Sequence, residues 1–159
     1  MRTEYNDGMP YLIDGHNLIP KLELRLDSVD DELELINILQ EFCRLERKQV
    51  EVYFDGAPQT ATRKAGSVTA YFVPLGTTAD DAIRKHLKRL GKSAKNWVVV
   101  TSDRQVQANA RASHSEIISS ESFAKMLNQV RDTAPKANVD RKLSDSEVDE
   151  WLRFFEKGR

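Results

Sequence analysis

Three short apolar runs in this chain each end at, or just before, an aspartate: Asp14, Asp55 and Asp103. If each run is a strand of one parallel sheet, the three carboxylates lie at the edge formed by the carboxyl ends of the strands, where such folds hold their ligands. Asp80 and Asp81 follow a further apolar run and lie at the start of a predicted helix on the same side. We therefore expect these aspartates to converge at one edge of a sheet.

Clustered carboxylates repel one another: two of them about 4 Å apart cost about 1 kcal/mol in water and about 4 kcal/mol at an effective dielectric constant of 20. Protonation or a divalent cation can offset this repulsion. The chain has one cysteine and three dispersed histidines, so its hard oxygen ligands favour Mg²⁺ or Mn²⁺ over zinc. Such an ion can make water a nucleophile and clamp a phosphate oxygen. We assign Asp14, Asp80 and Asp103 to metal binding and catalysis on this basis.

The other acids of the group also have structural interpretations. Asp81 lies three residues after Thr78, which is the spacing of a capping box. Asp80 lies at the second helical position, where an acid also interacts favourably with the helix dipole. Asp55 precedes a glycine and fits a turn. We keep Asp81 as a fourth candidate metal ligand and Asp55 as a supporting residue.

Polar residues beside the acids are candidates for supporting roles. Asn17 can hold the ligands or the substrate, or it can make an Asx turn. Ser102, like Thr101, can orient water or cap the next helix. His16 lies inside the first motif and is a candidate for substrate contact, whereas His86 is expected to be structural.

The net charge of −1 hides an uneven distribution. Residues 23–51 contain nine acids and four bases, whereas residues 59–111 contain three acids and ten bases. A basic segment whose few acids are clustered indicates a surface for a polyanion around a metal site. The candidates for contacts with a phosphodiester backbone are Arg63, Lys64, Arg104 and Arg111. Ordinary solvated helix faces are the alternative.

Hydrophobic periodicity predicts the elements that must position these residues. Strands are expected at Leu12–Asp14, Val50–Asp55, Val68–Val73, Trp97–Thr101 and Glu116–Ile118. Helices are expected at about Val29–Lys48, Ala79–Leu90, Arg104–Arg111 and Ser120–Val130, with a last helix starting at Ser144. Strands that alternate with helices predict an α/β fold with a mostly parallel sheet.

Length and composition predict one domain, which we place at residues 1–135, followed by a linker and a C-terminal helix over 136–159 that packs on or extends it. No apolar stretch approaches the roughly 20 residues of a membrane span. The N-terminal segment Met1–Gly8 is polar, unlike a secretory signal. A single cysteine excludes an internal disulfide. We therefore expect a cytoplasmic protein that does not contact a membrane.

Four segments in a fixed order carry a resemblance to a known family: LIDGHNLI at 12–19, VYFDG at 52–56, TADDAI at 78–83 and VTSDRQ at 100–105. They resemble the NYN domain in its bacterial YacP-like form, which belongs to the PIN-like nuclease superfamily. The resemblance implies a three-layer α/β/α fold with five strands in the order 3-2-1-4-5. It also implies a ribonuclease that depends on magnesium or manganese. Family members include endoribonucleases, and a ribosome-associated role in messenger cleavage is known among them.

The resemblance carries the catalytic acids onto Asp14, Asp80 and Asp103, with Asn17 and Asp81 beside them. The chain departs from the family where it has His16 in place of a common tyrosine. This departure affects substrate contact and leaves metal binding intact.

We therefore expect a metal-dependent ribonuclease, in the first place an endoribonuclease, that acts on single-stranded or loop RNA and has the ribosome as a candidate partner. A catalytically weak RNA-binding module of the same fold is the main alternative. A small-molecule phosphatase is disfavoured, because His16 stands where that pattern places a second acid. A nucleotide-binding domain is disfavoured because the chain lacks glycine-rich phosphate loops. The sequence predicts no oligomeric state.

Overall fold

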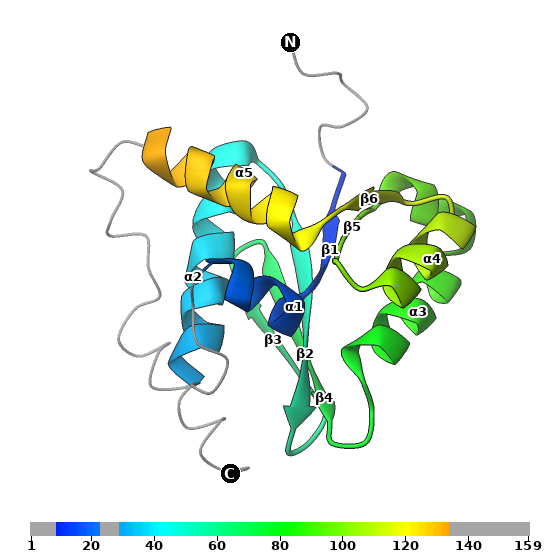
Figure 1. The fold of residues 1–159 in the computed structure, drawn as a ribbon. Helices are drawn as coiled ribbons and strands as arrows, with labels where there is room; N and C mark the ends of the chain where they lie inside the picture. Colours follow the sequence, from blue (N-terminus) through cyan, green and yellow to red (C-terminus); the bar gives the residue numbers. More distant parts are fainter. Residues whose placement is uncertain (1–8, 23–28, 134–159) are drawn as a thin grey trace.

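The computed structural model describes residues 9–22 and 29–133 (Figure 1). The expected C-terminal helix from Ser144 and the expected domain boundary at residue 135 lie outside the described residues. No helix in the described part of the chain is both long and apolar enough to cross a membrane.

A six-stranded sheet forms the centre of the molecule, with the strand order β3-β4-β2-β1-β5-β6. The strands are β1 (Tyr11–Asp14), β2 (Val50–Ala57), β3 (Ala61–Ala65), β4 (Val68–Pro74), β5 (Val98–Val100) and β6 (Glu116–Ile118). All neighbouring pairs are parallel except β3 and β4. The five strands expected from the sequence are present in the expected order, and β1 lies between β2 and β5.

The sixth strand, β3, corrects the expectation of a five-stranded sheet. Its sequence ATRKA has one β-branched residue, Thr62, and no aromatic residue, so it carries little of the pattern that usually indicates a strand. It forms because Gly66 and Ser67 make a two-residue turn, with Gly66 at φ +61°, that pairs Ala65 with Val68. Charged residues are typical of such an edge strand, because they discourage further pairing.

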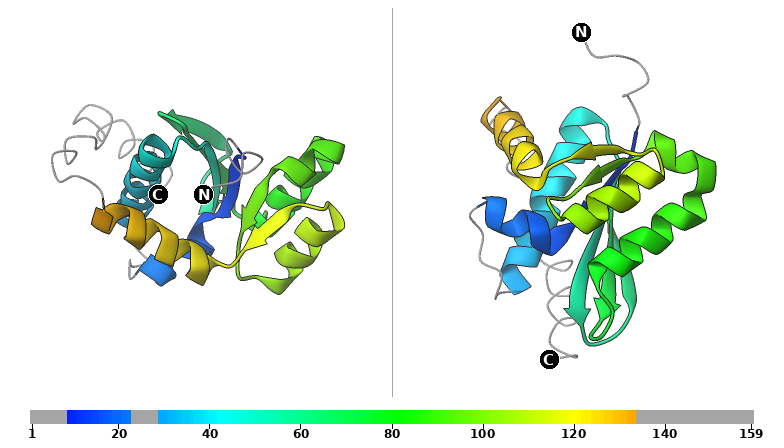
Figure 2. Two further views of the ribbon diagram at one scale, coloured as in Figure 1. Left: turned by 90° about the horizontal axis from the view of Figure 1, so that it is seen from above. Right: turned by 45° about the vertical axis from the view of Figure 1, so that its right-hand side comes forward.

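Helices cover both faces of the sheet, which gives the expected three layers (Figures 1 and 2). The helical elements are α1 (Gly15–Leu18), η2 (Ile19–Leu22), α2 (Val29–Glu46), α3 (Ala79–Leu90), η3 (Gly91–Asn96), α4 (Arg104–Ala112) and α5 (Ser120–Thr133). One core lies between the sheet and the α2/α5 layer and includes Tyr11, Phe42 and Phe123, whose rings are 5.3–5.6 Å apart. A smaller core joins the other face to α3 and α4.

Side-chain alternation in β1 decides which layer Asp14 faces. Tyr11 and Ile13 belong to the core under α2 and α5, whereas Leu12 belongs to the core under α3 and α4. Because successive side chains of a strand point to opposite faces, Asp14 points to the same side as Leu12. The carboxylate therefore leaves the sheet toward the layer that contains α3 and α4.

Gly15 follows Asp14 at a position with no room for a side chain. A Cβ at this position would lie 2.5 Å from Phe54 Cε1 and 2.9 Å from the carbonyl oxygen of Tyr53. Phe54 is fully buried and stacks on Phe72, so its ring cannot move aside freely.

Gly15→Ala is therefore expected to destabilise the protein by about 1–3 kcal/mol, the usual cost of overpacking a core. Urea denaturation measures the change. Ser93→Ala, at an exposed position in η3, is the control and is expected to stay within about 0.5 kcal/mol of the unsubstituted protein. Equal midpoints for both variants would contradict this steric interpretation.

Candidate active site

The structure brings Asp14 into one electrostatic group with acids from other elements. Its side chain is 7% exposed. Burial raises the pKa of Asp14 to about 7, and the negative charges of Asp80 and Asp55 contribute to the increase. The backbone N–H of Asn17, which donates to Asp14, and the charge of His16 lower the pKa but do not cancel these effects.

Asp80 and Asp103 form the other half of the group. Burial raises the pKa of Asp80, and the charges of Asp103, Asp55 and Asp81 raise it further. The charge of Asp80 acts on Asp14, and the charge of Asp103 acts on Asp80. Asp80 therefore links the three acids expected to be catalytic electrostatically.

Two helices begin at this group and partly offset its negative charge. Asp103 is the N-cap of α4, and its Oδ1 accepts hydrogen bonds from the backbone N–H groups of Gln105 at 2.8 Å and Val106 at 3.1 Å. Asp80 is the second residue of α3. The N-terminus of a helix carries a partial positive charge, so both helices favour anions at this edge.

His16 is held between two carboxylates. Its Nδ1 lies 3.0 Å from Asp55 Oδ1, and its Nε2 lies 2.7 Å from Glu32 Oε2. Burial alone would lower the pKa of His16, but the hydrogen bonds with Glu32 and Asp55 raise it. The other oxygen of Asp55 accepts the backbone N–H of Ala79 at 3.2 Å. These contacts join α2 to the start of α3 and thereby position Asp80. The ring of His16 faces into the protein more than toward a substrate.

Glu32 was not among the residues selected from the sequence. Its side chain is only 7% exposed. In the sequence it is one of several acids near the start of a predicted helix, where acids are common because they interact favourably with the helix dipole. Its partner His16 lies 16 residues away, and no local spacing indicates the contact.

Asn17 fastens the loop that carries Asp103. Its Oδ1 accepts hydrogen bonds from the Ser102 backbone N–H at 2.8 Å and from the Ser120 hydroxyl at 2.6 Å. The Ser102 hydroxyl donates to Glu121 and accepts the Ser120 backbone N–H. Asn17 and Ser102 therefore tie α1, the β5–α4 loop and α5 together.

Of the two alternatives given for Ser102 and Thr101, neither residue caps the following helix. Asp103 is the cap, and Thr101 instead accepts the backbone N–H of Asp103 through its hydroxyl at 3.0 Å.

Asp81 lies at the border of the group. Its backbone N–H donates to Thr78 Oγ1 at 3.1 Å, and its carboxylate contacts Arg84 at 3.3 Å. The carboxylate is 53% exposed. Thr78 thus caps α3 by accepting the Asp81 N–H. The negative charge of Asp81 raises the pKa of Asp80.

The four basic candidates lie at different distances from the acids. Arg104 follows Asp103 directly and is exposed, whereas Arg111 lies in the last turn of α4, roughly 10 Å further along the helix axis. Arg63 and Lys64 are on β3, three strands away from β1, which is roughly 14 Å at the usual strand spacing. Only Arg104 is brought next to the acids.

A second polar cluster lies on the same face of the sheet, and its Tyr53 is paired in register with Asp14. The Tyr53 hydroxyl lies 2.8 Å from His86 Nδ1, and the Tyr71 hydroxyl donates to Glu51 at 2.7 Å. Tyr53 and Tyr71 stack with their ring centroids 4.7 Å apart. His86 is buried among these groups, in agreement with the structural role expected for it.

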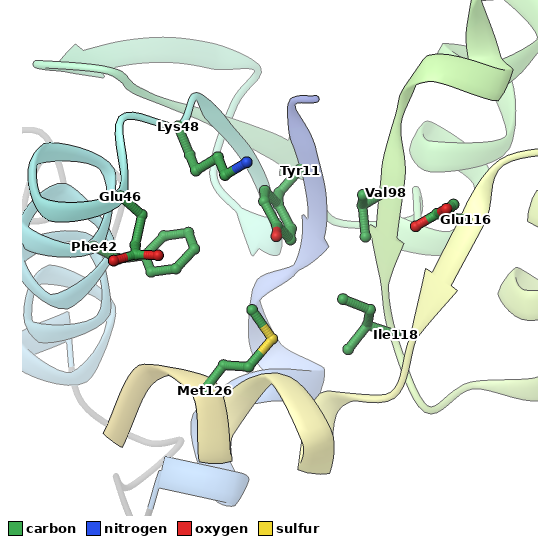
Figure 3. A pocket seen from close by; sticks show the side chains of 8 residues that line it. All are labelled: Tyr11, Phe42, Glu46, Lys48, Val98, Glu116, Ile118 and Met126. Atoms are coloured by element: carbon green, nitrogen blue, oxygen red, sulfur yellow. The ribbon is translucent and has the colours of Figure 1, made fainter. Parts of the chain in front are cut away.

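A pocket between the sheet, α2 and α5 is lined by Tyr11, Phe42, Val98 and Met126, among others (Figure 3). Tyr11 and Val98 are the first residues of their strands. The pocket therefore lies at the edge of the sheet opposite to the acids.

The acids suit a hard divalent cation by their chemistry. They offer only oxygen donors, and burial, together with the charges of neighbouring carboxylates, raises the pKa values of Asp14 and Asp80. Within residues 9–22 and 29–133, no three His, Cys, Asp or Glu side chains are yet arranged closely enough to hold a metal ion. Carboxylates would have to move inward, and lose a proton, to bind one.

The YacP-like NYN domain family matches residues 11–154 of the chain. The protein belongs to this family. Two crystal structures of Rae1 (YacP) from Bacillus subtilis share its fold. The W164L mutant has a TM-score of 0.65 and 22% sequence identity, over 92% of this chain and 91% of that chain. A second Rae1 structure has a TM-score of 0.64 and 21% identity, over 92% of this chain and 88% of that chain.

No curated protein matches the chain in sequence. The comparisons confirm the YacP-like resemblance and the PIN-like α/β fold. At this level of identity, the similarity to the solved structures concerns the fold alone.

The raised pKa of Asp14 gives a testable consequence for stability. The pKa is 3.8 in an ordinary environment and about 7 in the folded protein. Asp14 therefore binds a proton more tightly in the folded protein than in the unfolded chain. Its contribution to the free energy of unfolding falls as the pH rises from 3.8 to about 7. Asp14→Asn removes this charge and keeps an oxygen that can accept the Asn17 N–H.

In EDTA, Asp14→Asn is expected to stabilise the protein on the order of 2–4 kcal/mol at pH 8 and by clearly less at pH 5. Urea denaturation at both pH values measures the difference. Asp132→Asn, at an exposed position in α5, is the control and should show no such pH dependence. The interpretation is wrong if Asp14→Asn destabilises the protein equally at both pH values.

Proposed function

We propose that this protein is a ribonuclease that depends on Mg²⁺ or Mn²⁺ and cleaves RNA internally. The observation that carries the proposal is the convergence of Asp14, Asp80 and Asp103 at the carboxyl edge of the sheet, with raised pKa values for the first two. Membership in the YacP-like NYN family and the nuclease-type fold support it.

In this proposal Asp14, Asp80 and Asp103 hold the metal ion. A bound ion supplies an activated water and a clamp for the phosphate oxygen. Asp14, whose pKa is about 7, would release a proton when the ion binds. The Asp55–His16–Glu32 contacts keep the start of α3, and with it Asp80, in place.

The remaining groups of the site orient the substrate. Arg104 is exposed beside Asp103 and is placed to contact a phosphate of the RNA backbone. The N-termini of α3 and α4 favour the same anion. Asn17 and Ser102 act on Asp103 through the loop that they fasten. We extend the proposal to a cytoplasmic protein that acts on messenger RNA, with the ribosome as a candidate partner.

The second candidate function is an RNA-binding module of the same fold with little or no catalysis. It is favoured by one observation: in the described part of the chain the acids do not yet form a metal site of three ligands. The two functions differ in whether a divalent ion starts cleavage.

The test is cleavage of a labelled circular single-stranded RNA with Mg²⁺, with Mn²⁺ and with EDTA. A circular substrate has no ends, so only internal cleavage opens it. Cleavage is expected with either metal and not with EDTA. Asp14→Asn and Asp103→Asn are each expected to reduce the rate by at least about 100-fold, since metal catalysis contributes several kcal/mol.

Asparagine at position 103 can still cap α4, so the second variant is expected to fold. Asp132→Asn serves as the control for loss of a carboxylate elsewhere. Full activity in the Asp14→Asn/Asp103→Asn double variant would remove the mechanism. RNA binding without cleavage under any divalent ion would favour the binding module.

A further inference from the structure

The two helical layers of the protein carry opposite charge. The elements α3, η3 and α4 contain two acids and eight bases. The helices α2 and α5 contain eight acids and three bases. The two acids of the basic layer are Asp80 and Asp81, at the candidate active site. A polyanion is therefore attracted to one face of the molecule and repelled from the other.

The basic charge is concentrated on α3 and η3. Residues 82–102 contain six bases and no acid. Arg84 is paired with Asp81. The other five bases are exposed, and we call them the basic ridge: Lys85, Lys88, Arg89, Lys92 and Lys95. Soluble surfaces normally intersperse both signs of charge, and this one does not.

The basic ridge begins close to the acids and leads away from them. Figure 1 shows the chain passing from β4 through a loop into α3, which then runs away from that edge of the sheet. Lys85, Lys88 and Arg89 have the spacing of one helical face. At the usual rise per residue they lie roughly 7–14 Å along the axis from Asp80. A strand with one phosphate at Asp80 can therefore lie along α3.

We propose that the basic ridge binds the phosphodiester backbone of a single-stranded RNA next to the bond that is cleaved. The inference rests on the proposed function, because the acids mark the proposed cleavage site beside which the ridge begins. Exposed lysines contact phosphates as point charges and do not read bases. The binding is therefore independent of sequence and weakens steeply as salt is added.

The test is fluorescence anisotropy with a labelled, unstructured single-stranded RNA, in EDTA, at several salt concentrations. The ridge variant is Lys85→Gln/Lys88→Gln/Lys92→Gln. The control variant is Arg47→Gln/Lys125→Gln/Arg131→Gln, which removes the same charge from exposed positions outside the ridge. Thermal melting checks that both variants are folded.

The ridge variant is expected to lower the slope of log K against log salt by about 2, at about 0.7 for each lost phosphate contact. Its affinity should fall between about 10-fold and about 100-fold at 0.1 M salt, whereas the control variant should stay within about threefold of the unsubstituted protein. An unchanged slope in the ridge variant, or an equal loss in both variants, would overturn the proposal.

Cleavage assays separate this proposal from the proposed function. With Mn²⁺ and a range of RNA concentrations, the ridge variant is expected to keep kcat within about twofold and to raise KM, because it loses contacts with phosphates that flank the reacting one. If the unsubstituted protein cleaves RNA but both variants have the same slope of log K against log salt, the ridge proposal is wrong and the ribonuclease proposal stands. If the ridge variant has the lower slope but no divalent ion supports cleavage, the ribonuclease proposal is wrong and the ridge proposal stands.

Discussion

Repulsion among carboxylates at one edge of the sheet is the constraint on which the rest of this site depends. Asp14 is buried at the end of the central strand, and Asp80 and Asp103 begin two helices beside it. The fold tolerates this arrangement through raised pKa values, the two helix N-termini and the Asn17 amide. Such crowding costs stability, and this cost supports the proposal that the acids hold a cation.

The groups that hold the acids come from distant parts of the chain. His16 connects Glu32 on α2 with Asp55 on β2, and Asp55 in turn accepts a hydrogen bond from the first residue of α3. Asn17 connects the loop before Asp103 with α5. Two consecutive residues after Asp14 thus fix the two other acids, each through a different set of hydrogen bonds. This explains why the first motif of the chain contains histidine and asparagine directly after the acid and its glycine.

Much of this could be predicted from the sequence, for physical reasons. Buried parallel strands are continuous apolar runs, so the sequence predicts β1, β2, β4 and β5, and their shared edge implies that Asp14 and Asp103 lie at the same side of the sheet. The edge strand β3 was missed because its ATRKA sequence lacks that signal and depends on the Gly66–Ser67 turn. The partner of His16 could not be found, because a contact with Glu32 is made only by the folded chain. Arg63 and Lys64 were selected by charge alone, and charge does not reveal that their strand lies at the far side of the sheet.

Proton release on metal binding tests the central claim most directly. Calorimetric titration of Mn²⁺ in buffers of different ionisation enthalpy counts the protons released. At pH 6.5 the account predicts release of about one proton, because Asp14, with a pKa of about 7, is then mostly protonated and must ionise to bind the metal. At pH 8.5 the release should largely disappear, and Asp14→Asn should weaken binding and abolish this pH dependence. Tight Mn²⁺ binding without proton release at pH 6.5 would contradict the account. An unchanged Mn²⁺ affinity in Asp14→Asn would also contradict it.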